Sequence, residues 1–178
     1  MMRAWTLIGM MGAGKTTIGR MLAELSGREF VDTDVLIQNR LGKTIPKIFE
    51  FYGEPTFREH ESSIVQSLTP GPYVISTGGG AIMRQENWDH LSSIGELIYL
   101  QSSPEVLKER LRNSKRKRPL LLTENWENTF DALFENRKTI YEKASVVVNL
   151  DDIDVADAAL KVYNTLIELE RGRGGVTT

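Results

Sequence analysis

The chain has 178 residues, of which 22 are Lys or Arg, 24 are Asp or Glu and 2 are His, and its formal net charge is −2. That length fits one compact domain with a core of its own. The sequence contains no cysteine, which excludes disulfide scaffolds, thiolate zinc sites and cysteine nucleophiles. With only 2 histidines, a metal centre built from several histidines is not expected.

Positive charge is concentrated in one segment. Seven of the 22 basic residues fall between Lys108 and Arg118. A run such as Lys115-Arg116-Lys117-Arg118 is typical of a nucleic-acid or localisation tract, so a nucleotide-dependent nucleic-acid module is one hypothesis. Against it, no aromatic residue is interleaved in this run and the chain is not basic overall. We therefore expect no nucleic-acid partner.

Short apolar runs alternate with segments of helical periodicity along the chain. The expected strands are residues 5–8, 30–31, 73–76, 97–100 and 146–148. The expected helices are residues 15–25, 35–41, 45–51, 56–68, 126–143 and 155–169, with another that begins at 103–105. Strands that alternate with helices indicate an α/β fold with a parallel sheet covered on both faces. Ligands of such folds bind at the carboxyl ends of the strands.

The first expected strand runs directly into a glycine-rich segment. Residues 9–16, GMMGAGKT, match the phosphate-binding pattern G-x-x-x-x-G-K-[ST] in full. Glycines allow backbone amides to turn toward phosphate oxygens, and the start of the following helix favours an anion. In such a loop Lys15 contacts the β- and γ-phosphates and the Thr16 hydroxyl binds Mg²⁺. The predicted nucleotide contacts are Gly12, Ala13, Gly14, Lys15, Thr16 and Thr17.

Other nucleotide-binding classes match the sequence less well. A dinucleotide fingerprint, G-x-G-x-x-G, fails because Thr17 stands where the third glycine counted from Gly12 would be. A GTPase normally has an Asn-Lys-x-Asp segment that recognises guanine, and this sequence has none. The phosphate loop by itself still leaves a kinase, an ATPase and a regulatory switch open.

Two carboxylates follow the second expected strand, in Asp32-Thr33-Asp34. If this segment is extended, alternation directs Asp32 and Asp34 the same way. One can then serve Mg²⁺ while the other orients a substrate hydroxyl or takes its proton. Because Ser76-Thr77 stands where an acidic residue would usually end the third strand, Asp32 is the predicted metal residue. The alternative for this segment is an Asx turn that caps the next helix.

Two arginines and a glycine run are candidate substrate contacts. Arg58 and Glu61 are spaced i, i+3 on one face of an expected helix. Arg58 can bind a carboxylate as a fork while Glu61 holds its guanidinium, or the two can form a surface ion pair. Arg137 is a second arginine able to meet a carboxylate, or else a solvent-exposed helix residue. Gly78–Gly80 either lets a ligand approach the backbone closely or forms a flexible turn.

Together these segments resemble the shikimate kinase family. The shared segments, in order, are GMMGAGKT at 9–16, DTD at 32–34, IFEFYGEPTFREHE at 48–61, STGGGA at 76–81, RPLL at 118–121 and RKTIY at 137–141. The resemblance spans residues 7–169. It implies a three-layer α/β/α P-loop kinase fold with a five-stranded parallel sheet, and we expect a single domain over residues 1–170. Within it we expect a substrate-binding helical region at about 34–68 and a lid at about 112–125. Residues 171–178 are expected to form a disordered tail.

The resemblance also implies an activity and the residues that perform it. The reaction is transfer of the γ-phosphoryl group of ATP to the 3-hydroxyl of shikimate, in the biosynthesis of chorismate and aromatic amino acids. By position, the implied catalytic residues are Lys15, Asp34 and Arg118, of which Arg118 approaches the ATP phosphates from the lid. The implied substrate contacts are Asp34, Arg58, Gly79 and Arg137, and the implied Mg²⁺ residues are Thr16 and Asp32.

The sequence departs from the family pattern in two places. Residues 149–153 contain no Arg or Gln to contact the adenine, and residues 113–117 of the lid lack the glycines of some relatives. A related kinase for a substrate such as gluconate is the alternative, since two arginines and two aspartates suit a carboxylated polyol generally. The expected partners are ATP, Mg²⁺ and shikimate, without a membrane. We expect a monomer in the cytoplasm.

Overall fold

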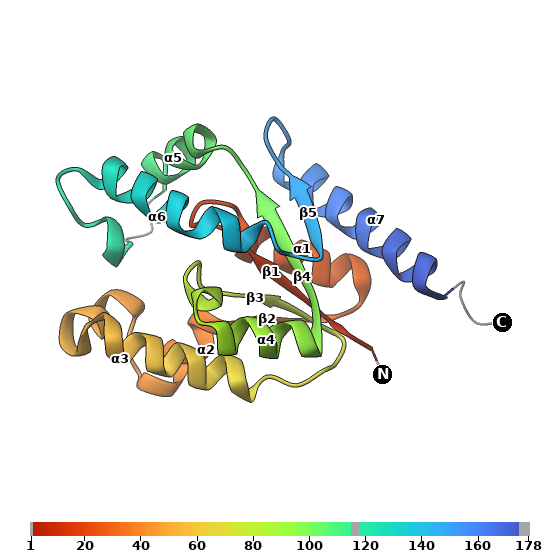
Figure 1. Cartoon of the computed structure of the whole chain (residues 1–178), viewed down its shortest axis with the longest axis horizontal. Helices are drawn as coiled ribbons and strands as arrows, with labels where there is room; N and C mark the ends of the chain where they lie inside the picture. The colour runs from red at the N-terminus through yellow and green to blue at the C-terminus, as the bar shows by residue number, and fades with distance from the viewer. Residues whose placement is uncertain (1, 115–117, 175–178) are drawn as a thin grey trace.

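The structure, a computed structural model, describes residues 2–114 and 118–174 (Figure 1). Its strands are β1 (Ala4–Ile8), β2 (Glu29–Asp32), β3 (Tyr73–Ser76), β4 (Gly95–Gln101) and β5 (Val146–Asn149). Its helices are α1 (Lys15–Ser26), α2 (Thr33–Leu41), α3 (Ile45–Ser67), α4 (Gln85–Ile94), α5 (Pro104–Arg112), α6 (Trp126–Tyr141) and α7 (Val155–Gly174). Two 3₁₀ turns, η1 (Ala81–Met83) and η2 (Pro119–Leu121), complete the described elements.

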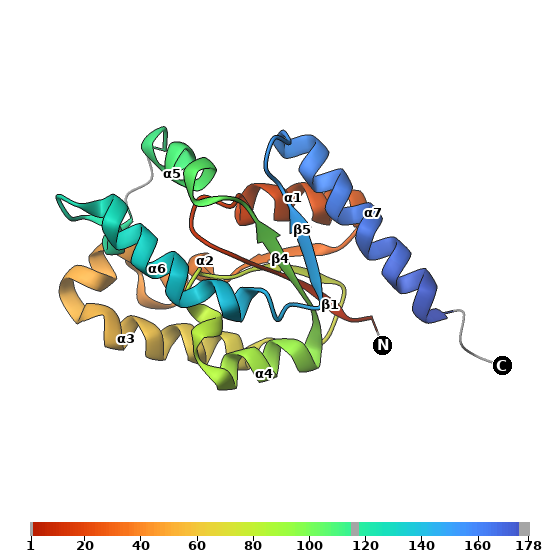
Figure 2. The ribbon, with the colours of Figure 1, turned by 45° about the horizontal axis from the view of Figure 1, so that its top comes forward.

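The strands form one five-stranded sheet in the order β2-β3-β1-β4-β5, and every pairing is parallel. All residues of β1 are buried, as expected of a central strand covered on both faces. Helices α1 and α7 pack on one face of the sheet, and α4 covers the other face on the same side as α3 and α6 (Figure 2). The predicted three-layer architecture and its five-stranded parallel sheet are confirmed.

The strand order explains why distant segments of the chain meet. Strands β2, β3 and β1 are neighbours, and each runs into one of the segments singled out from the sequence: residues 32–34, 77–80 and 9–16. Because parallel strands all end at the same edge of the sheet, these three segments lie side by side there.

Helix α4 was missed by the sequence analysis. Only Leu91 and Ile94 among its apolar residues are fully buried, while Asn87 is buried as a polar residue. With two apolar anchors in ten residues, the helical periodicity is weak. The Asn87 amide is satisfied by donating to Ser62 Oγ at 3.1 Å and to Ala81 O at 2.8 Å. That burial is a tertiary property and leaves no mark in the hydrophobic pattern.

Two other predictions of local structure can be compared with the fold. The predicted break between helices 45–51 and 56–68 is present within α3, where Gly53 has φ 76° and ψ 170°. The predicted disordered tail is wrong for residues 171–174, because α7 continues to Gly174. Glu170 anchors this last turn, since its Oε1 accepts from Arg28 at 3.0 Å and from Trp5 Nε1 at 3.1 Å. Residues 175–178 lie outside the described residues.

Candidate functional site

Two cavities lie next to each other at the carboxyl edge of the sheet. The phosphate-loop cavity, about 370 Å³, lies over the turn between β1 and α1. The acceptor cavity, about 360 Å³, lies between α2, α3 and α6. Five residues line both cavities: Met11, Asp34, Gly78, Gly79 and Arg118. A group bound in one cavity therefore has direct access to a group bound in the other.

The phosphate loop has the backbone that its sequence predicts. Gly12 and Gly14 have φ values of 88° and 90°, which side chains other than glycine rarely tolerate. Gly12, Gly14, Lys15, Thr16 and Thr17 line the phosphate-loop cavity. Ala13 is instead fully buried, and its amide donates to Met10 O at 3.2 Å. The start of α1 is thus presented to the cavity, where its amides favour an anion.

Lys15 is a buried amine held against the loop itself. Its Nζ donates to Gly9 O at 2.8 Å and to Met10 O at 3.0 Å. Burial, reinforced by the positive charge of Arg118, lowers the pKa of Lys15 from 10.5 to about 7. The charged form is therefore only about half populated at neutral pH in the free protein. An anion bound in this cavity favours that charged form.

The two aspartates occupy different positions from those expected. Thr33 and Asp34 are not extended, because α2 begins at Thr33 and Asp32 caps it by accepting from the amides of Asp34 at 3.0 Å and Val35 at 3.3 Å. The prediction of an extended segment is wrong, and the Asx cap describes Asp32. Both carboxylates nevertheless line the phosphate-loop cavity, whereas Asp34 alone of the two also lines the acceptor cavity.

The pairing of Thr16 with Asp32 fits a magnesium site of the kind that kinases use. Thr16 Oγ1 donates to Asp32 Oδ2 at 2.9 Å. Within residues 2–114 and 118–174, no group of three His, Cys, Asp or Glu side chains that could hold a metal is present. Mg²⁺ in phosphoryl-transfer sites takes one or two protein oxygens and completes its shell with water and phosphate oxygens. The oxygen donors of Thr16 and Asp32 match that requirement.

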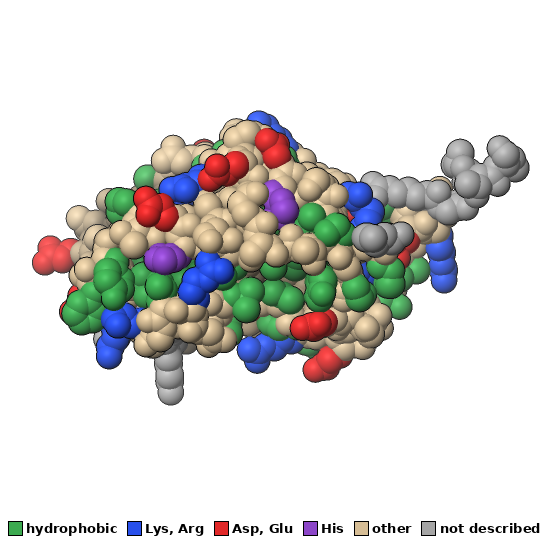
Figure 3. All heavy atoms as spheres, turned by 90° about the horizontal axis from the view of Figure 1, so that it is seen from below, with side chains coloured by type: hydrophobic (Ala, Val, Ile, Leu, Met, Phe, Trp, Pro, Cys, Tyr) green, Lys and Arg blue, Asp and Glu red, His purple; other side chains and the backbone are tan. Residues whose placement is uncertain are grey.

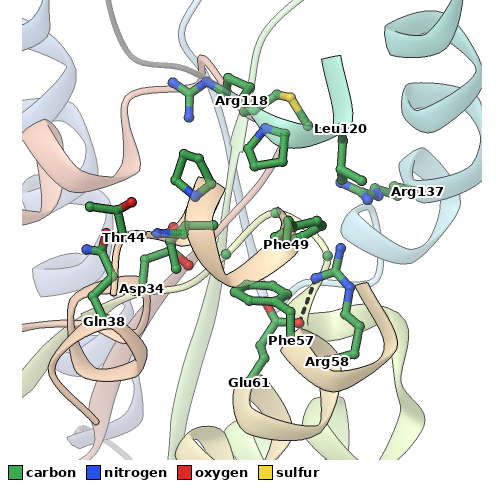
Figure 4. Close-up of a pocket in the computed structure, with 17 residues that line it drawn as sticks. Asp34, Gln38, Thr44, Phe49, Phe57, Arg58, Glu61, Arg118, Leu120 and Arg137 are labelled. Atoms are coloured by element: carbon green, nitrogen blue, oxygen red, sulfur yellow. Dashed lines mark hydrogen bonds and ion pairs between the residues drawn. The ribbon is translucent and has the colours of Figure 1, made fainter. Parts of the chain in front are cut away.

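Arg58 is fixed in the wall of the acceptor cavity by two carboxylates, one of which, that of Glu61, is shown in Figure 4. Its Nη1 donates to Glu61 Oε2 at 2.7 Å, and its Nη2 donates to Glu54 Oε1 at 3.0 Å. The Arg58 side chain is 16% exposed and that of Glu61 is 2% exposed. Burial raises the pKa of Glu61, and the charge of Arg58 opposes this shift. The pair is therefore not a surface ion pair but part of the cavity.

The glycine run makes room for the arginines of the cavity. A Cβ atom on Gly80 would lie 2.6 Å from Arg58 Nη1, and one on Gly79 would lie 3.4 Å from Arg137 Nη1. Arg137 is 5% exposed, so the solvent-exposed alternative for this arginine is wrong. Within the described part of the chain, the amides of Gly79 and Gly80 donate to no acceptor. Both arginines and two backbone amides thus border one cavity.

Arg118 is the described residue of the basic segment that reaches both parts of the site. It lines both cavities, and it is close enough to Lys15 to contribute to the lowered pKa of that residue. Figure 4 shows Arg118 and Leu120 across the acceptor cavity from Arg58 and Glu61. The remainder of the run, residues 115–117, lies outside the described residues.

The sequence analysis missed the apolar wall of the acceptor cavity and one cation of the phosphate-loop cavity. Phe49 and Phe57, whose rings are 4.7 Å apart, form this wall with Pro46 and Leu120. The only signal the sequence offers for this wall is that Phe49, Phe57 and Leu120 stand inside the shared segments at 48–61 and 118–121. Arg110 lines the phosphate-loop cavity and donates to Leu150 O at 3.4 Å, yet it had been counted only as a member of the basic segment.

Comparisons with known proteins identify relatives along nearly the whole chain. A family model described as shikimate kinase matches residues 11–167. A shikimate kinase of Actinobacillus pleuropneumoniae serotype 5b (strain L20) is 43% identical over 165 residues, which cover 92% of each chain. A shikimate kinase of Thiobacillus denitrificans is 44% identical over 162 residues, which cover 90% of this chain and 88% of the relative.

Comparison with solved structures identifies the same family. The structure of shikimate kinase from Acinetobacter baumannii in complex with shikimate has a TM-score of 0.88 at 38% identity and covers 94% of both chains. A gluconokinase from Sinorhizobium meliloti 1021 has a TM-score of 0.60 at 16% identity, covering 96% of this chain and 97% of its own. At that identity the second likeness shows a common fold and nothing about the substrate.

Proposed function

This chain belongs to the shikimate kinase family, and we propose that its acceptor cavity binds shikimate while its phosphate-loop cavity binds ATP. The activity is phosphoryl transfer to an alcohol, from the γ-position of ATP to the 3-hydroxyl of shikimate. The products are ADP and shikimate 3-phosphate, in the route to chorismate and the aromatic amino acids. The observation that supports this assignment of the cavities is their common wall of Asp34, Gly78, Gly79 and Arg118.

The carboxylate of shikimate is proposed to lie between Arg58 and Arg137. These arginines line the same cavity; Arg137 is buried, and Arg58 is held by the buried carboxylate of Glu61. A guanidinium fork matches the geometry of a carboxylate. Because Glu61 and Glu54 already orient Arg58, little side-chain entropy is lost when the substrate binds. The unpartnered amides at Gly79 and Gly80 add donors for the ring substituents.

Asp34 is proposed to hold the hydroxyl group that attacks the γ-phosphorus. Of the two aspartates, only Asp34 lines both cavities, so only Asp34 can meet an acceptor next to a bound nucleotide. Its carboxylate accepts a hydrogen bond from this hydroxyl group and orients the hydroxyl oxygen toward the γ-phosphorus. In a loose transition state little proton transfer is needed before the new bond forms.

Lys15 and Arg118 are proposed to offset the charge of the phosphates during transfer. They lie on the phosphate-loop cavity and near each other, where a water-poor setting strengthens their effect on phosphate oxygens. Thr16 and Asp32 would hold Mg²⁺. When bound, the ion neutralises charge on the β- and γ-phosphates. Backbone contacts come from Gly12, Gly14 and Thr17, whereas the amide of Ala13 already donates to Met10 O. Arg110 adds a cation to the same cavity.

The wider organisation of the chain is proposed on the same basis. Residues 1–170 act as one domain, with the substrate-binding region at about 34–68 and the lid at about 112–125. Closure of the lid excludes water and so limits hydrolysis of ATP. In the described part of the chain, none of the helices has the length and apolar character needed to cross a bilayer. We propose a cytoplasmic monomer.

No nucleic-acid role is proposed for the basic segment. Its member Arg118 is committed to the two cavities. Figure 3 shows the face formed by α3 and α4, away from the basic segment, where positive and negative side chains are interspersed rather than gathered by sign. A duplex or single strand needs a continuous basic surface.

A substrate panel tests the assignment. The purified protein is incubated with ATP and Mg²⁺ and with shikimate, gluconate or deoxyadenosine in turn, and release of ADP is followed by a coupled assay. We expect turnover that depends on shikimate. Faster turnover with gluconate would assign the acceptor cavity to another carboxylated polyol, and turnover with no acceptor preference would contradict the proposal.

A further inference from the structure

Tyr141 has a buried hydroxyl group that none of the proposed steps uses. The residue ends α6 and has 0% exposure. Its hydroxyl donates to Gly79 O at 2.5 Å and lies 3.7 Å from Met10 Sδ. It also forms a side-chain hydrogen bond with Arg137, one helical turn earlier. A single oxygen atom therefore contacts the glycine run, the phosphate loop and an arginine of the acceptor cavity.

The chemistry of the phenol allows these contacts at the same time. Burial raises the pKa of Tyr141 to about 12, although the nearby charge of Arg137 opposes this shift. The group is therefore neutral at every pH used in an assay and retains its O–H. A neutral phenol can donate once and still accept through its oxygen lone pairs. Tyr141 can thus donate to Gly79 O while it accepts from the guanidinium of Arg137.

The contact with Gly79 O sets the direction of a second group. Because the peptide unit is planar and trans, a carbonyl aimed at Tyr141 directs the following N–H, that of Gly80, the opposite way. Gly80 lines the acceptor cavity, and its amide donates to no acceptor within residues 2–114 and 118–174. Glycine peptides rotate easily, so the segment needs an external contact to keep one orientation.

The ring of Tyr141 and its hydroxyl have separable roles. The ring stacks on Tyr99 with centroids 5.1 Å apart and an interplanar angle of 23°. A phenylalanine at position 141 would keep this stack and the filled volume. Only the contacts of the oxygen atom would be lost, and all of its protein partners belong to the two cavities or the loop between them.

We propose that Tyr141 is a positioning residue for shikimate, which fixes the Gly79–Gly80 peptide and the Arg137 guanidinium through its hydroxyl group. This inference rests on the proposed function of the acceptor cavity. It predicts an effect on binding of the acceptor and little effect on binding of the nucleotide, because the two affected groups face the acceptor.

The test compares Tyr141→Phe with Tyr99→Phe. Both variants remove one phenol oxygen from the same stacked pair, but the Tyr99 hydroxyl forms no hydrogen bond within the described ranges. For Tyr141→Phe we expect the KM for shikimate to rise about tenfold, as for loss of one or two buried hydrogen bonds. The kcat should stay within about threefold and the KM for ATP within about twofold, as the lost contacts do not touch the phosphates.

A direct binding measurement guards against a loss of folded protein. Shikimate is titrated calorimetrically into each variant in the presence of ADP, which stabilises the native state by mass action. We expect the same tenfold weakening for Tyr141→Phe alone. Unchanged shikimate affinity in Tyr141→Phe, or an equal loss of affinity in Tyr99→Phe, would overturn the inference. Neither result would affect the proposed function, provided that the wild-type protein turns over shikimate. Absence of shikimate turnover in the wild type would overturn both.

Discussion

The phosphate-loop cavity and the acceptor cavity differ in how they are built. The first is built around one contiguous segment, residues 11–17, whose backbone and helix start create the anion site, and the residues that follow β2 and β3 complete its lining together with Arg110, Ser114 and Arg118. The second is assembled from α2, α3, α6, η2 and the glycine run, which are up to about a hundred residues apart along the chain. A contiguous loop can be shared by many enzymes, whereas an assembled cavity can differ from one kinase to another and so can select the acceptor.

This difference leads to separable predictions for single substitutions. Residues of the phosphate-loop cavity should affect catalysis with any acceptor, and residues of the acceptor cavity should affect the KM for shikimate. Residues of the common wall should affect both. The predictions below test that separation, from the largest expected effect to the smallest.

Lys15→Ala should lower kcat by at least about a thousandfold, because the lost charge faces the phosphates where charge develops during transfer. Shikimate binding in the absence of nucleotide should be retained, since Lys15 does not line the acceptor cavity. Coupled ADP release and a shikimate titration measure the two quantities. The matched control is Lys138→Ala, an exposed lysine of α6. Near-normal turnover in folded Lys15→Ala would remove this lysine from the mechanism.

Arg118→Ala should lower kcat by about a hundredfold and should also weaken the binding of both ATP and shikimate, because this residue lines both cavities. Steady-state kinetics with each substrate varied in turn provide the measurement. Arg112→Ala is the control, since Arg112 belongs to the same basic segment but pairs with Glu127 on the surface. An effect confined to the KM for shikimate would place Arg118 outside the phosphate contacts.

Arg58→Ala should raise the KM for shikimate by about 30- to 100-fold, the cost of a lost charge-assisted carboxylate contact. The KM for ATP should change by less than about twofold, since Arg58 does not line the phosphate-loop cavity. Arg40→Ala is the control, because Arg40 is exposed on neighbouring α2 and pairs with Ser63. An unchanged KM for shikimate would exclude Arg58 from carboxylate binding.

ATP affinity should depend on pH through Lys15. Its pKa is about 7 in the free protein, and bound phosphates raise that pKa because they favour the charged amine. Binding above pH 7 therefore takes up a proton, and ATP affinity falls as the pH rises, by roughly 15-fold between pH 7 and 8.5. Calorimetry in buffers of different ionisation enthalpy measures the uptake. Lys15→Met should remove this proton uptake. Release of a proton when ATP binds to the wild-type protein would contradict the lowered pKa of Lys15.

The same contrast explains what the sequence could predict. Residues 9–16 are read as a phosphate site because the motif, the strand before it and the helix after it are all local. The edge of the sheet where the site lies follows equally from the alternation of strands and helices. The position of Asp34 does not, because the sequence leaves open whether Thr33 and Asp34 continue the strand or begin a helix. In the structure Asp32 both ends β2 and caps α2, so that Asp34 lies on the helix.

The acceptor cavity could be predicted only in part. The spacing of Arg58 and Glu61 predicts their contact, but not that the pair is buried against Gly80. Helix α4 and the hydroxyl contacts of Tyr141 have no periodic signal, because each depends on polar atoms that meet across the fold. Arg110 was missed for another reason. It lines the phosphate-loop cavity, but in the sequence nothing distinguishes it from the other basic residues of its segment.

The most direct test of the central claim is the identity and ratio of the products. The purified protein is supplied with ATP, Mg²⁺ and shikimate at concentrations from low to saturating, and ADP and phosphorylated shikimate are followed together in wild type and Arg58→Ala. The account predicts one shikimate 3-phosphate for each ADP in wild type, with Arg58→Ala recovering only as shikimate is raised. ADP released without phosphorylated shikimate, or full activity of Arg58→Ala at low shikimate, would contradict it.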